Sequence, residues 1–186
     1  MFSKYTEDFN FNKLKSYDVE KIKDIAIKFN DEWYINTERQ NRNTTHQHTL
    51  TYYIYETNLF WRIEDAFISE KRAINSQLLD AVEPIVKDLE EFYDGIRGQV
   101  LLIKLLSNKQ IPPHTDKGAY LMKARRHHIP IVTSSGTTFG VGEEEISMGT
   151  GECWEINNSR THYVNNYSDI DRIHLLVDIM PRKELS

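Results

Sequence analysis

Apolar residues recur at helical spacing near the start of the chain. Four of them lie three or four positions apart and so share one helical face: Ile22, Ile25, Ala26 and Phe29. The run Ser16–Glu20 before them offers residues that can cap a helix. Residues 1–17 carry no such period, and we expect an irregular arm or an edge strand there.

A longer helical pattern runs from Glu70 to Arg97. Its apolar stripe has the width of a helix that packs on one face: Ile74, Leu78, Leu79, Val82, Ile85, Val86, Leu89 and Phe92. Pro84 lies inside the stripe, so a kink or a break is expected near it, because proline lacks the N–H that a helix interior uses. Gly95 and Gly98 are expected to end the helical region.

After residue 98 the pattern changes to short apolar and β-branched runs, and one such run also precedes the long helix. These runs predict strands at 49–56, 99–106, 126–133, 145–148, 151–156, 162–164 and 172–179. The glycines of the segment 134–142 are expected to form turns and bulges. Short strands separated by turns are typical of a sandwich or barrel.

We therefore predict a mainly β protein whose core is a double-stranded β-helix, that is, a cupin-like jelly roll. Residues 99–180 are expected to form this core. Residues 1–98 are expected to supply supporting helices and a segment on the substrate side. No linker or repeat divides the chain, so 1–186 is interpreted as a single domain.

The composition of the chain excludes several classes of partner. The chain has 186 residues and a formal net charge of −5, with no basic block, so nucleic acid is not expected as a partner. Its single cysteine, Cys153, excludes a disulfide within the chain and fits a reducing compartment. No secretory signal or long apolar span is visible, and we expect a cytoplasmic protein without a membrane partner. No strand–GxGxxG–helix pattern occurs, so nucleotide binding is not expected.

The candidate chemistry centres on His114 and Asp116. They lie two apart, so on an extended segment both side chains leave the same face. A second histidine from a distant strand, His162, would complete a facial triad of two histidines and one carboxylate. Such a triad leaves positions open on non-haem Fe(II) for oxygen and an organic co-substrate. Zinc is the competing metal, because three ligands and an open position also suit catalytic zinc.

Arg172 adds a second signal. It opens a strand in which five of the next seven residues are apolar, so a buried arginine there needs an anion. A dicarboxylate co-substrate would be such an anion, since arginine pairs with carboxylates through two hydrogen bonds.

With these residues in place, the sequence resembles the aspartyl/asparaginyl β-hydroxylase-like family of Fe(II)/2-oxoglutarate-dependent dioxygenases. The matching segments lie within residues 99–180 and read IPPHTD, RRHHIPIVT, GECWEINNSRTHYVNN and DRIHLLVDIM. The resemblance implies the same jelly-roll fold. It also implies Fe(II) as the metal and 2-oxoglutarate as the co-substrate.

Residue by residue, the resemblance implies that His114, Asp116 and His162 are the metal ligands and form the catalytic centre. It assigns the distal carboxylate of 2-oxoglutarate to Arg172, with further contacts from Arg126 and His128. Whether Arg125 or Arg126 faces the site depends on the register of the strand. We choose Arg126, because Ile129 and Ile131 then share the opposite face.

Two positions depart from patterns known in the family. Some members have a small hydroxyl residue on the strand before the HxD loop that helps to hold the distal carboxylate, and Ile103 stands there in this chain. The best-known animal members lack the metal-binding aspartate, whereas Asp116 is present here. A complete triad favours ordinary hydroxylase chemistry, in which molecular oxygen is consumed and 2-oxoglutarate is decarboxylated to succinate.

Substrate recognition is expected from the polar loop before the first core strand, because loops on a rigid scaffold often carry recognition. This loop, residues 31–52, offers an arginine, a histidine and a tryptophan near a threonine. The candidate substrate-binding residues are Trp33, Arg39, His46 and Thr49. The expected substrate is an amino acid, or an amino-acid side chain in a peptide or protein. Packing and solvation of the loop are the competing interpretation of these residues.

Two alternative functions remain open from the sequence. The first is a cupin-like binding module that contains a metal. It would not need two arginines for a dicarboxylate. The second is a zinc hydrolase on the same scaffold, for which the segment Glu143–Glu145 offers a general base only from a loop.

Overall fold

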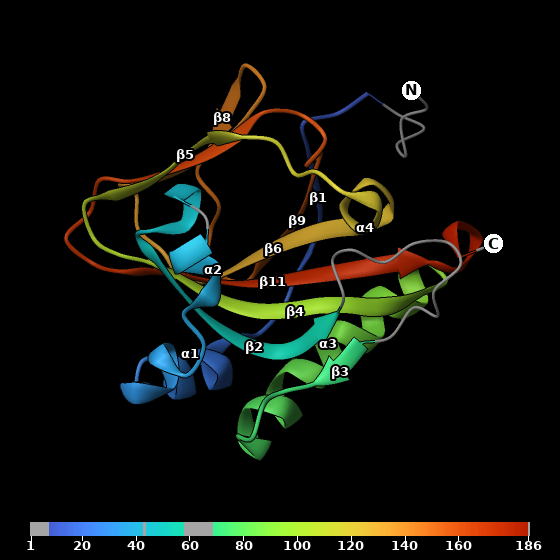
Figure 1. Cartoon of the computed structure of the whole chain (residues 1–186), viewed down its shortest axis with the longest axis horizontal. Coiled ribbons are helices and arrows are strands. Elements are labelled where there is room, and N and C mark those ends of the chain that lie inside the picture. The colour runs from blue at the N-terminus through green and yellow to red at the C-terminus, as the bar shows by residue number, and fades with distance from the viewer. Residues whose placement is uncertain (1–7, 43, 58–68, 186) are drawn as a thin grey trace.

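The computed structural model describes residues 8–42, 44–57 and 69–185, and in this part of the chain two antiparallel sheets face each other (Figure 1). The larger sheet has seven strands, in spatial order β1 (Phe11–Ser16), β9 (Glu152–Ile156), β6 (Arg125–Val132), β11 (Arg172–Pro181), β4 (Gly95–Leu105), β2 (Thr49–Thr57) and β3 (Ser69–Lys71). The smaller sheet has four, in the order β5 (Lys109–His114), β10 (His162–Asn166), β7 (Thr137–Val141) and β8 (Glu144–Ile146). The fold is a double-stranded β-helix, as the sequence predicts.

Helices surround this core. In the described part of the chain they are α1 (Glu20–Ala26), α2 (Glu38–Arg42), α3 (Ser76–Phe92) and α4 (Ala119–Lys123), with 3-10 turns η1 (Asp31–Tyr34), η2 (Thr44–His46) and η3 (Arg182–Glu184). Helices α1 and α3 cover the outer face of the larger sheet (Figure 1). None of the helices described here has the length and apolar character needed to cross a membrane.

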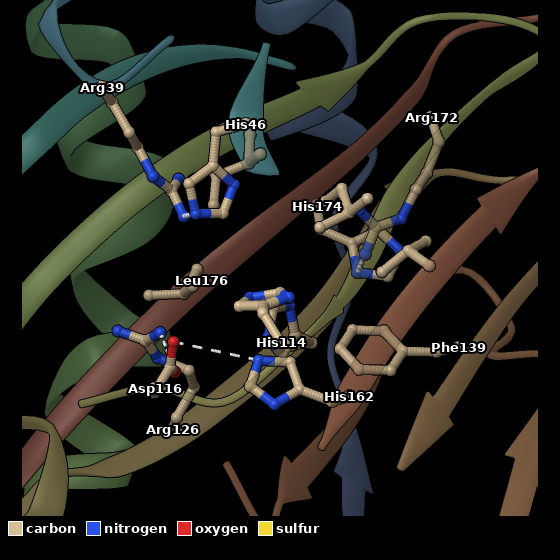
Figure 2. Close-up of a pocket in the computed structure, with 14 residues that line it drawn as sticks. Arg39, His46, His114, Asp116, Arg126, Phe139, His162, Arg172, His174 and Leu176 are labelled. Carbon is tan, nitrogen blue, oxygen red and sulfur yellow. Dashed lines mark hydrogen bonds and ion pairs between the residues drawn. The ribbon is translucent and has the colours of Figure 1, made fainter. Parts of the chain in front are cut away.

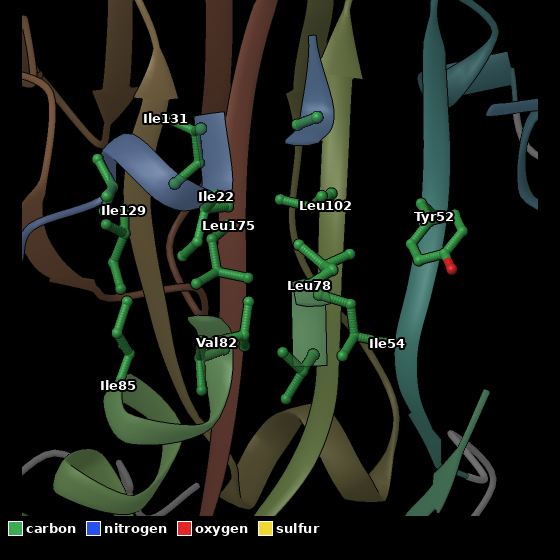
Figure 3. Close-up of a cluster of buried hydrophobic side chains, with 14 of the residues drawn as sticks. Ile22, Tyr52, Ile54, Leu78, Val82, Ile85, Leu102, Ile129, Ile131 and Leu175 are labelled. Atoms are coloured by element: carbon green, nitrogen blue, oxygen red, sulfur yellow. The ribbon is translucent and has the colours of Figure 1, made fainter. Parts of the chain in front are cut away.

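The main hydrophobic core lies between these two helices and the larger sheet (Figure 3). Its helix side includes Ile22 from α1 and Leu78 from α3, and its sheet side includes Leu102, Ile129 and Leu175. Because side chains alternate across a strand, the neighbours of these sheet residues point to the opposite face, toward the smaller sheet. The space between the two sheets is therefore where polar side chains of β6 and β11 meet.

The long helix is shorter than its apolar pattern. Helix α3 begins at Ser76, because the side chain of Asn75 accepts a hydrogen bond from the backbone N–H of Leu78 and caps it. The expected break at Pro84 is wrong, since the helix runs through this residue to Phe92. Residues at both ends of the predicted stripe are not packed: Ile74 is 85% exposed and Phe92 is 59% exposed.

Strand β4 follows almost at once and begins four residues earlier than its apolar run predicts. Asp94 takes a positive φ of 42° and turns the chain out of the helix. Gly95 then lies against β11, where a Cβ atom would come within 2.5 Å of Ile179 and 2.9 Å of the Met180 carbonyl oxygen. Glycine is required by this close approach, so here it begins a strand and does not merely end a helix.

The other predicted strands are confirmed with shifts of one or two residues at their ends. The sequence analysis assigns the glycines of the segment 134–142 to turns and bulges and predicts no strand there, but the segment contains strand β7. Gly140 of this strand packs against the ring of Tyr163 on β10, which explains why a glycine interrupts an otherwise regular pattern. The N-terminal arm forms the edge strand β1 where the structure describes it, while residues 1–7 lie outside the described part. Cys153 is buried, as expected of a structural thiol.

Candidate metal and anion site

A pocket lies between the two sheets and is lined by residues of six strands and of the segment before β2, most of the candidate residues among them (Figure 2). Its lining residues are Arg39, His46, Ile103, Ile111, His114, Asp116, Arg126, His128, Phe139, His162, Val164, Arg172, His174 and Leu176. The smaller sheet supplies the two histidines of the triad. The larger sheet supplies Arg126 and His128 from β6, and Arg172 and His174 from β11.

His114, Asp116 and His162 form one cluster, with their potential ligand atoms all within 4.8 Å of one another. His114 ends β5 and His162 begins β10, and the two residues are partners in the register of these strands. The chain then places Asp116 beside them, with its Oδ1 3.9 Å from Nε2 of His162. Spacing in the sequence brings together only His114 and Asp116. The pairing of β5 with β10 adds His162 and completes the triad.

The tautomers of both histidines suit metal binding. Nδ1 of His114 lies 2.9 Å from the carbonyl oxygen of Pro112, and Nδ1 of His162 lies 3.0 Å from that of Arg160. A carbonyl oxygen can only accept, so each Nδ1 carries a proton and Nε2 is the ring nitrogen left for a metal. Burial lowers the pKa of His162 and keeps its ring neutral. Two neutral imidazoles and one carboxylate are the donor set that Fe(II) takes in a facial triad.

Asp116 is held by a clamp of buried polar groups. Its Oδ2 accepts hydrogen bonds from Nη1 of Arg126 at 2.5 Å and from the amide of Asn158 at 3.1 Å, so Oδ1 is the oxygen left toward His162. Arg126 is fixed in turn by Asp178, which accepts from its Nε at 2.9 Å and from its Nη2 at 2.8 Å. The hydroxyl of Tyr120 donates to the same carboxylate at 3.0 Å.

The charges of this clamp reinforce one another. Burial alone would raise the pKa of Asp116, but Arg126 and His162 hold it well below its usual range. Burial likewise opposes the charge of Arg126, but Asp116 and Asp178 raise its pKa above the usual value. Asp116 is therefore a carboxylate at every working pH, and Arg126 has its charge balanced by two neighbours.

Arg172 is a different kind of arginine, because no carboxylate balances it among the residues described. It is 2% exposed, and its Nη2 donates to Nδ1 of His174 at 2.6 Å. Its Nε is buried and has no hydrogen-bond partner. Burial lowers its pKa to about 9, so it still carries its charge at neutral pH. Phe139 lies under the guanidinium, 5.9 Å from its carbon, and His128 packs on the same ring.

Arg39 and His46 lie at the upper left of Figure 2 and Arg172 and His174 at the upper right, with the triad below both pairs. Nη2 of Arg39 lies 3.2 Å from Nε2 of His46, and Nη1 of Arg39 is buried without a partner. Burial, followed by the charge of Arg126, lowers the pKa of Arg39 to about 10. Burial and Arg39 lower the pKa of His46 to about 2, so its ring is neutral.

Two of the four candidate substrate-binding residues, Thr49 and Trp33, do not line the pocket. The hydroxyl of Thr49 donates to the carbonyl oxygen of His46 at 2.8 Å and so fixes the neighbouring loop. Trp33 lies on the helix side of the larger sheet, in the main core, with Lys104 over its ring. Arg126 faces the pocket, whereas Arg125 pairs with Glu155 outside it.

The sequence analysis assigned no role to Asp178, Asn158 and Tyr120, whose hydrogen bonds support the triad, or to His174, which contacts Arg172. One signal was available for two of them. His174 and Asp178 share a face with Arg172 by the alternation of their strand, and a polar residue in such an apolar run needs a partner.

Comparisons with known proteins can now be set beside this geometry. The family model described as Aspartyl/Asparaginyl beta-hydroxylase matches residues 19–181, and the chain therefore belongs to this family. A comparison with curated proteins gives no match.

Among solved structures, the chain is similar to an oxidoreductase of the 2OG-Fe(II) oxygenase family from Burkholderia pseudomallei, with a TM-score of 0.65 and 11% identity over 92% of this chain and 84% of that one. It is also similar to the viral collagen prolyl hydroxylase from Paramecium Bursaria Chlorella virus-1, solved as a 2OG complex, with a TM-score of 0.54 and 8% identity over 92% of this chain and 96% of that one. At these identities the likeness shows a shared fold, which is that of 2OG-Fe(II) oxygenases.

Proposed function

We propose that this member of the aspartyl/asparaginyl β-hydroxylase family is an Fe(II)- and 2-oxoglutarate-dependent dioxygenase that hydroxylates an amino acid or an amino-acid side chain in a peptide or protein. The observation that carries the proposal is one pocket with two features. It contains a histidine–aspartate–histidine triad with its lone pairs free, and a buried arginine, Arg172, that no carboxylate balances.

In this proposal the triad His114, Asp116 and His162 holds the iron. When bound, iron and 2-oxoglutarate supply the oxidising chemistry, and the protein supplies position, electrostatics and exclusion of water. Arg172 binds the distal carboxylate of the co-substrate, with His128 beside it. Arg126 holds Asp116 and also brings a positive charge next to the metal end of the co-substrate.

Arg39 and His46, which lie across the pocket from Arg172 and beside His114, are proposed to bind the substrate. Three arginines line the pocket, and two carboxylates, Asp116 and Asp178, both pair with Arg126. These five groups together carry one net positive charge. Fe(II) and 2-oxoglutarate carry equal and opposite charges, so this positive charge stays unbalanced when both are bound. A carboxylate of the substrate at Arg39 would balance it. Thr49 and Trp33 would then support this loop from behind without touching the substrate.

The competing zinc hydrolase finds less support in the pocket. Such an enzyme needs a general base near the metal-bound water. Glutamate or histidine could serve, but no glutamate is among the described residues that line the pocket, and Glu143, Glu144 and Glu145 are exposed elsewhere. Three further histidines line it, His46, His128 and His174, but burial lowers the pKa of each and makes it a weak base. Two unbalanced arginines also fit anionic ligands better than a hydrolytic water.

The test is succinate formation from 2-oxoglutarate by anaerobically iron-loaded protein after oxygen is admitted, with and without panels of amino acids and peptides. We expect turnover that a matching substrate stimulates. Asp116→Ala and His162→Ala should lose both iron binding and turnover, while Asp169→Ala, at an exposed carboxylate, should keep both. Unchanged iron binding and succinate formation in both triad variants would refute the assignment.

A further inference from the structure

A second cavity lies beside β2, next to the pocket that contains the triad. Its volume is about 350 Å³. The chain between α1 and α2 forms one wall with Glu32, Ile35 and Asn36, and the other wall comes from β2 and from residues that follow β3 (Figure 1). A cavity of this size suits a small ligand or a few side chains of a polypeptide.

One residue of the cavity wall has a buried hydroxyl without a partner. Thr51 is 1% exposed and lines the cavity, and its Oγ1 makes no hydrogen bond with any described residue. A hydroxyl can both donate and accept, and leaving it buried without a partner costs free energy. An occupant that brings an amide or another polar group to this point would satisfy it.

Much of the remaining wall is apolar and exposed. Ile74 is 85% exposed and Ile35 is 66% exposed, and both line the cavity together with the rings of Tyr52 and Tyr53. Exposed aliphatic side chains gathered around one cavity mark a surface that another molecule can cover.

Three carboxylates and one guanidinium accompany this apolar surface. Arg72 pairs with Glu56 at 3.0 Å and with Glu70 at 2.8 Å. In the described part of the chain, the carboxylate of Glu32 interacts only with backbone N–H groups. Three negative charges against one positive charge leave the cavity region negative. The complementary occupant therefore combines apolar side chains with positive charge.

The cavity and the pocket of the triad share a wall. Thr51 is the register partner of Ile103, which lines the pocket, and Tyr53 packs against the apolar cluster that contains Ile103. Asn36 lines the cavity, and Arg39 of the same segment lines the pocket. Register partners lie about 5 Å apart and an extended chain advances about 3.3 Å per residue, so a polypeptide with one residue in the pocket reaches the cavity within a few residues.

We propose that this cavity docks a basic, apolar segment of a polypeptide whose target residue enters the pocket of the triad. The substrate is then a residue within a polypeptide and not a free amino acid. The inference rests on the proposed function where it makes the segment part of a substrate, but the docking itself requires neither iron nor 2-oxoglutarate. A polypeptide suits the site better than a separate small molecule, because it can place one part in the cavity and another in the adjoining pocket.

The experiment measures binding of a fluorescently labelled peptide to metal-free protein by anisotropy, so that no turnover is needed. The probe is acetyl-Lys-Leu-Arg-Tyr-Lys-Leu-Arg-amide. One comparison peptide has glutamate at every basic position, and the other has serine at every apolar position. We expect the probe to bind at least about tenfold more tightly than either, because charge and apolar surface both contribute.

Three variants of the cavity test where the probe binds. Ile74→Ser and Glu32→Gln change exposed positions and should not disturb folding; they should weaken the probe by about fivefold or more and by about twofold to fivefold. Thr51→Val has nearly the same shape without the hydroxyl and should weaken it by about fivefold. Ile27→Ser and Glu143→Gln make matching changes at exposed positions outside the cavity and should leave binding unchanged.

Equal binding of the three peptides, or binding that the cavity variants do not change, would overturn the inference. If tyramine competes as strongly as the unlabelled probe, the occupant is a small molecule. If the native protein forms dimers that Ile74→Ser abolishes, the occupant is a second copy of this chain. Either of these results also contradicts docking of a polypeptide substrate.

Turnover separates this inference from the proposed function. With iron-loaded protein and a peptide that stimulates succinate formation, Ile74→Ser should raise the KM for that peptide by about fivefold and leave decarboxylation without substrate unchanged. If a free amino acid is hydroxylated while peptides neither bind nor stimulate, the docking role fails and the proposed function stands. If peptides bind through the cavity but no succinate forms with any of them, the docking stands and the proposed function fails.

Discussion

Replacing Asp178 with asparagine tests whether the clamp behind Asp116 positions the metal ligand. Asp178 is fully buried and accepts two hydrogen bonds from Arg126 and one from Tyr120. Asparagine has nearly the same shape, but it has no charge and offers one acceptor and one donor group. Its NH₂ group would face a guanidinium N–H of Arg126, so one of the two hydrogen bonds that Arg126 donates to residue 178 is lost. Arg126 is left with Asp116 as its single carboxylate.

The structure sets the size of the effect. Removing one partner of a buried ion pair costs about 3–5 kcal/mol. Asparagine keeps one acceptor, so we expect the lower end, about 3 kcal/mol. For a chain of this size that lowers Tm by roughly 6–12 °C. Removing a group that orients a metal ligand typically weakens metal binding by about 10–100-fold.

Two measurements separate these effects: thermal unfolding of the metal-free protein, and anaerobic titration with Fe(II) or with Co(II) as a spectroscopic probe. The paired variant Arg126→Met with Asp178→Leu removes this ion pair but leaves Asp116 buried without a counter-charge. It should therefore be no more stable than Asp178→Asn, because a buried charge that loses its partner is costly. It should still bind metal weakly, because Asp116 has lost its clamp. Asp169→Asn serves as the exposed control. Metal affinity within about twofold of the native protein in both clamp variants would refute the positioning role.

Two further predictions concern the arginines on either side of the triad. Arg172→Ala should weaken 2-oxoglutarate by roughly thirtyfold or more, since truncating one partner of a buried charge pair costs about 2–5 kcal/mol. The same arginine should set a pH limit, because burial lowers its pKa to about 9. Native affinity for 2-oxoglutarate should be full below that pH and fall as pH rises through it, a dependence that Arg172→Ala should lose. Arg39→Ala should raise the substrate KM while leaving the decarboxylation of 2-oxoglutarate without substrate nearly intact, as measured by succinate formation. Equal loss of both reactions in folded Arg39→Ala protein would count against a substrate role.

The sequence predicts the site residues correctly where the alternation of side chains along one strand decides which of them face the pocket. His114 and Asp116 share a face by spacing alone, and the alternation of β6 places Arg126 toward the pocket once Ile129 and Ile131 are assigned to the core. Both expectations agree with the structure, because a period of two leaves no other choice of face.

The partners across strands could not be predicted in the same way. Asp178 is opposite Arg126 in the register of β11 and β6, but the register depends on loops whose lengths carry no simple rule. The predicted ends of helix α3 were wrong for a related reason. An apolar residue such as Ile74 fits the helical period equally well whether it is packed or exposed, and only the cap at Asn75 and the turn at Asp94 decide where the helix lies.

Strand β11 links the fold to the chemistry more directly than any other element. One of its faces carries Arg172, His174, Leu176 and Asp178, and all four are buried. The first two lie at the end of the pocket to which we assign the co-substrate, and Asp178 binds Arg126, which holds Asp116 of the triad. A slip of one residue would move all four to the helix side, which is occupied mainly by the apolar residues of the main core. The register that buries the core therefore also sets the distance between the metal triad and the anion site, so a substitution that loosens β11 should weaken both kinds of ligand together.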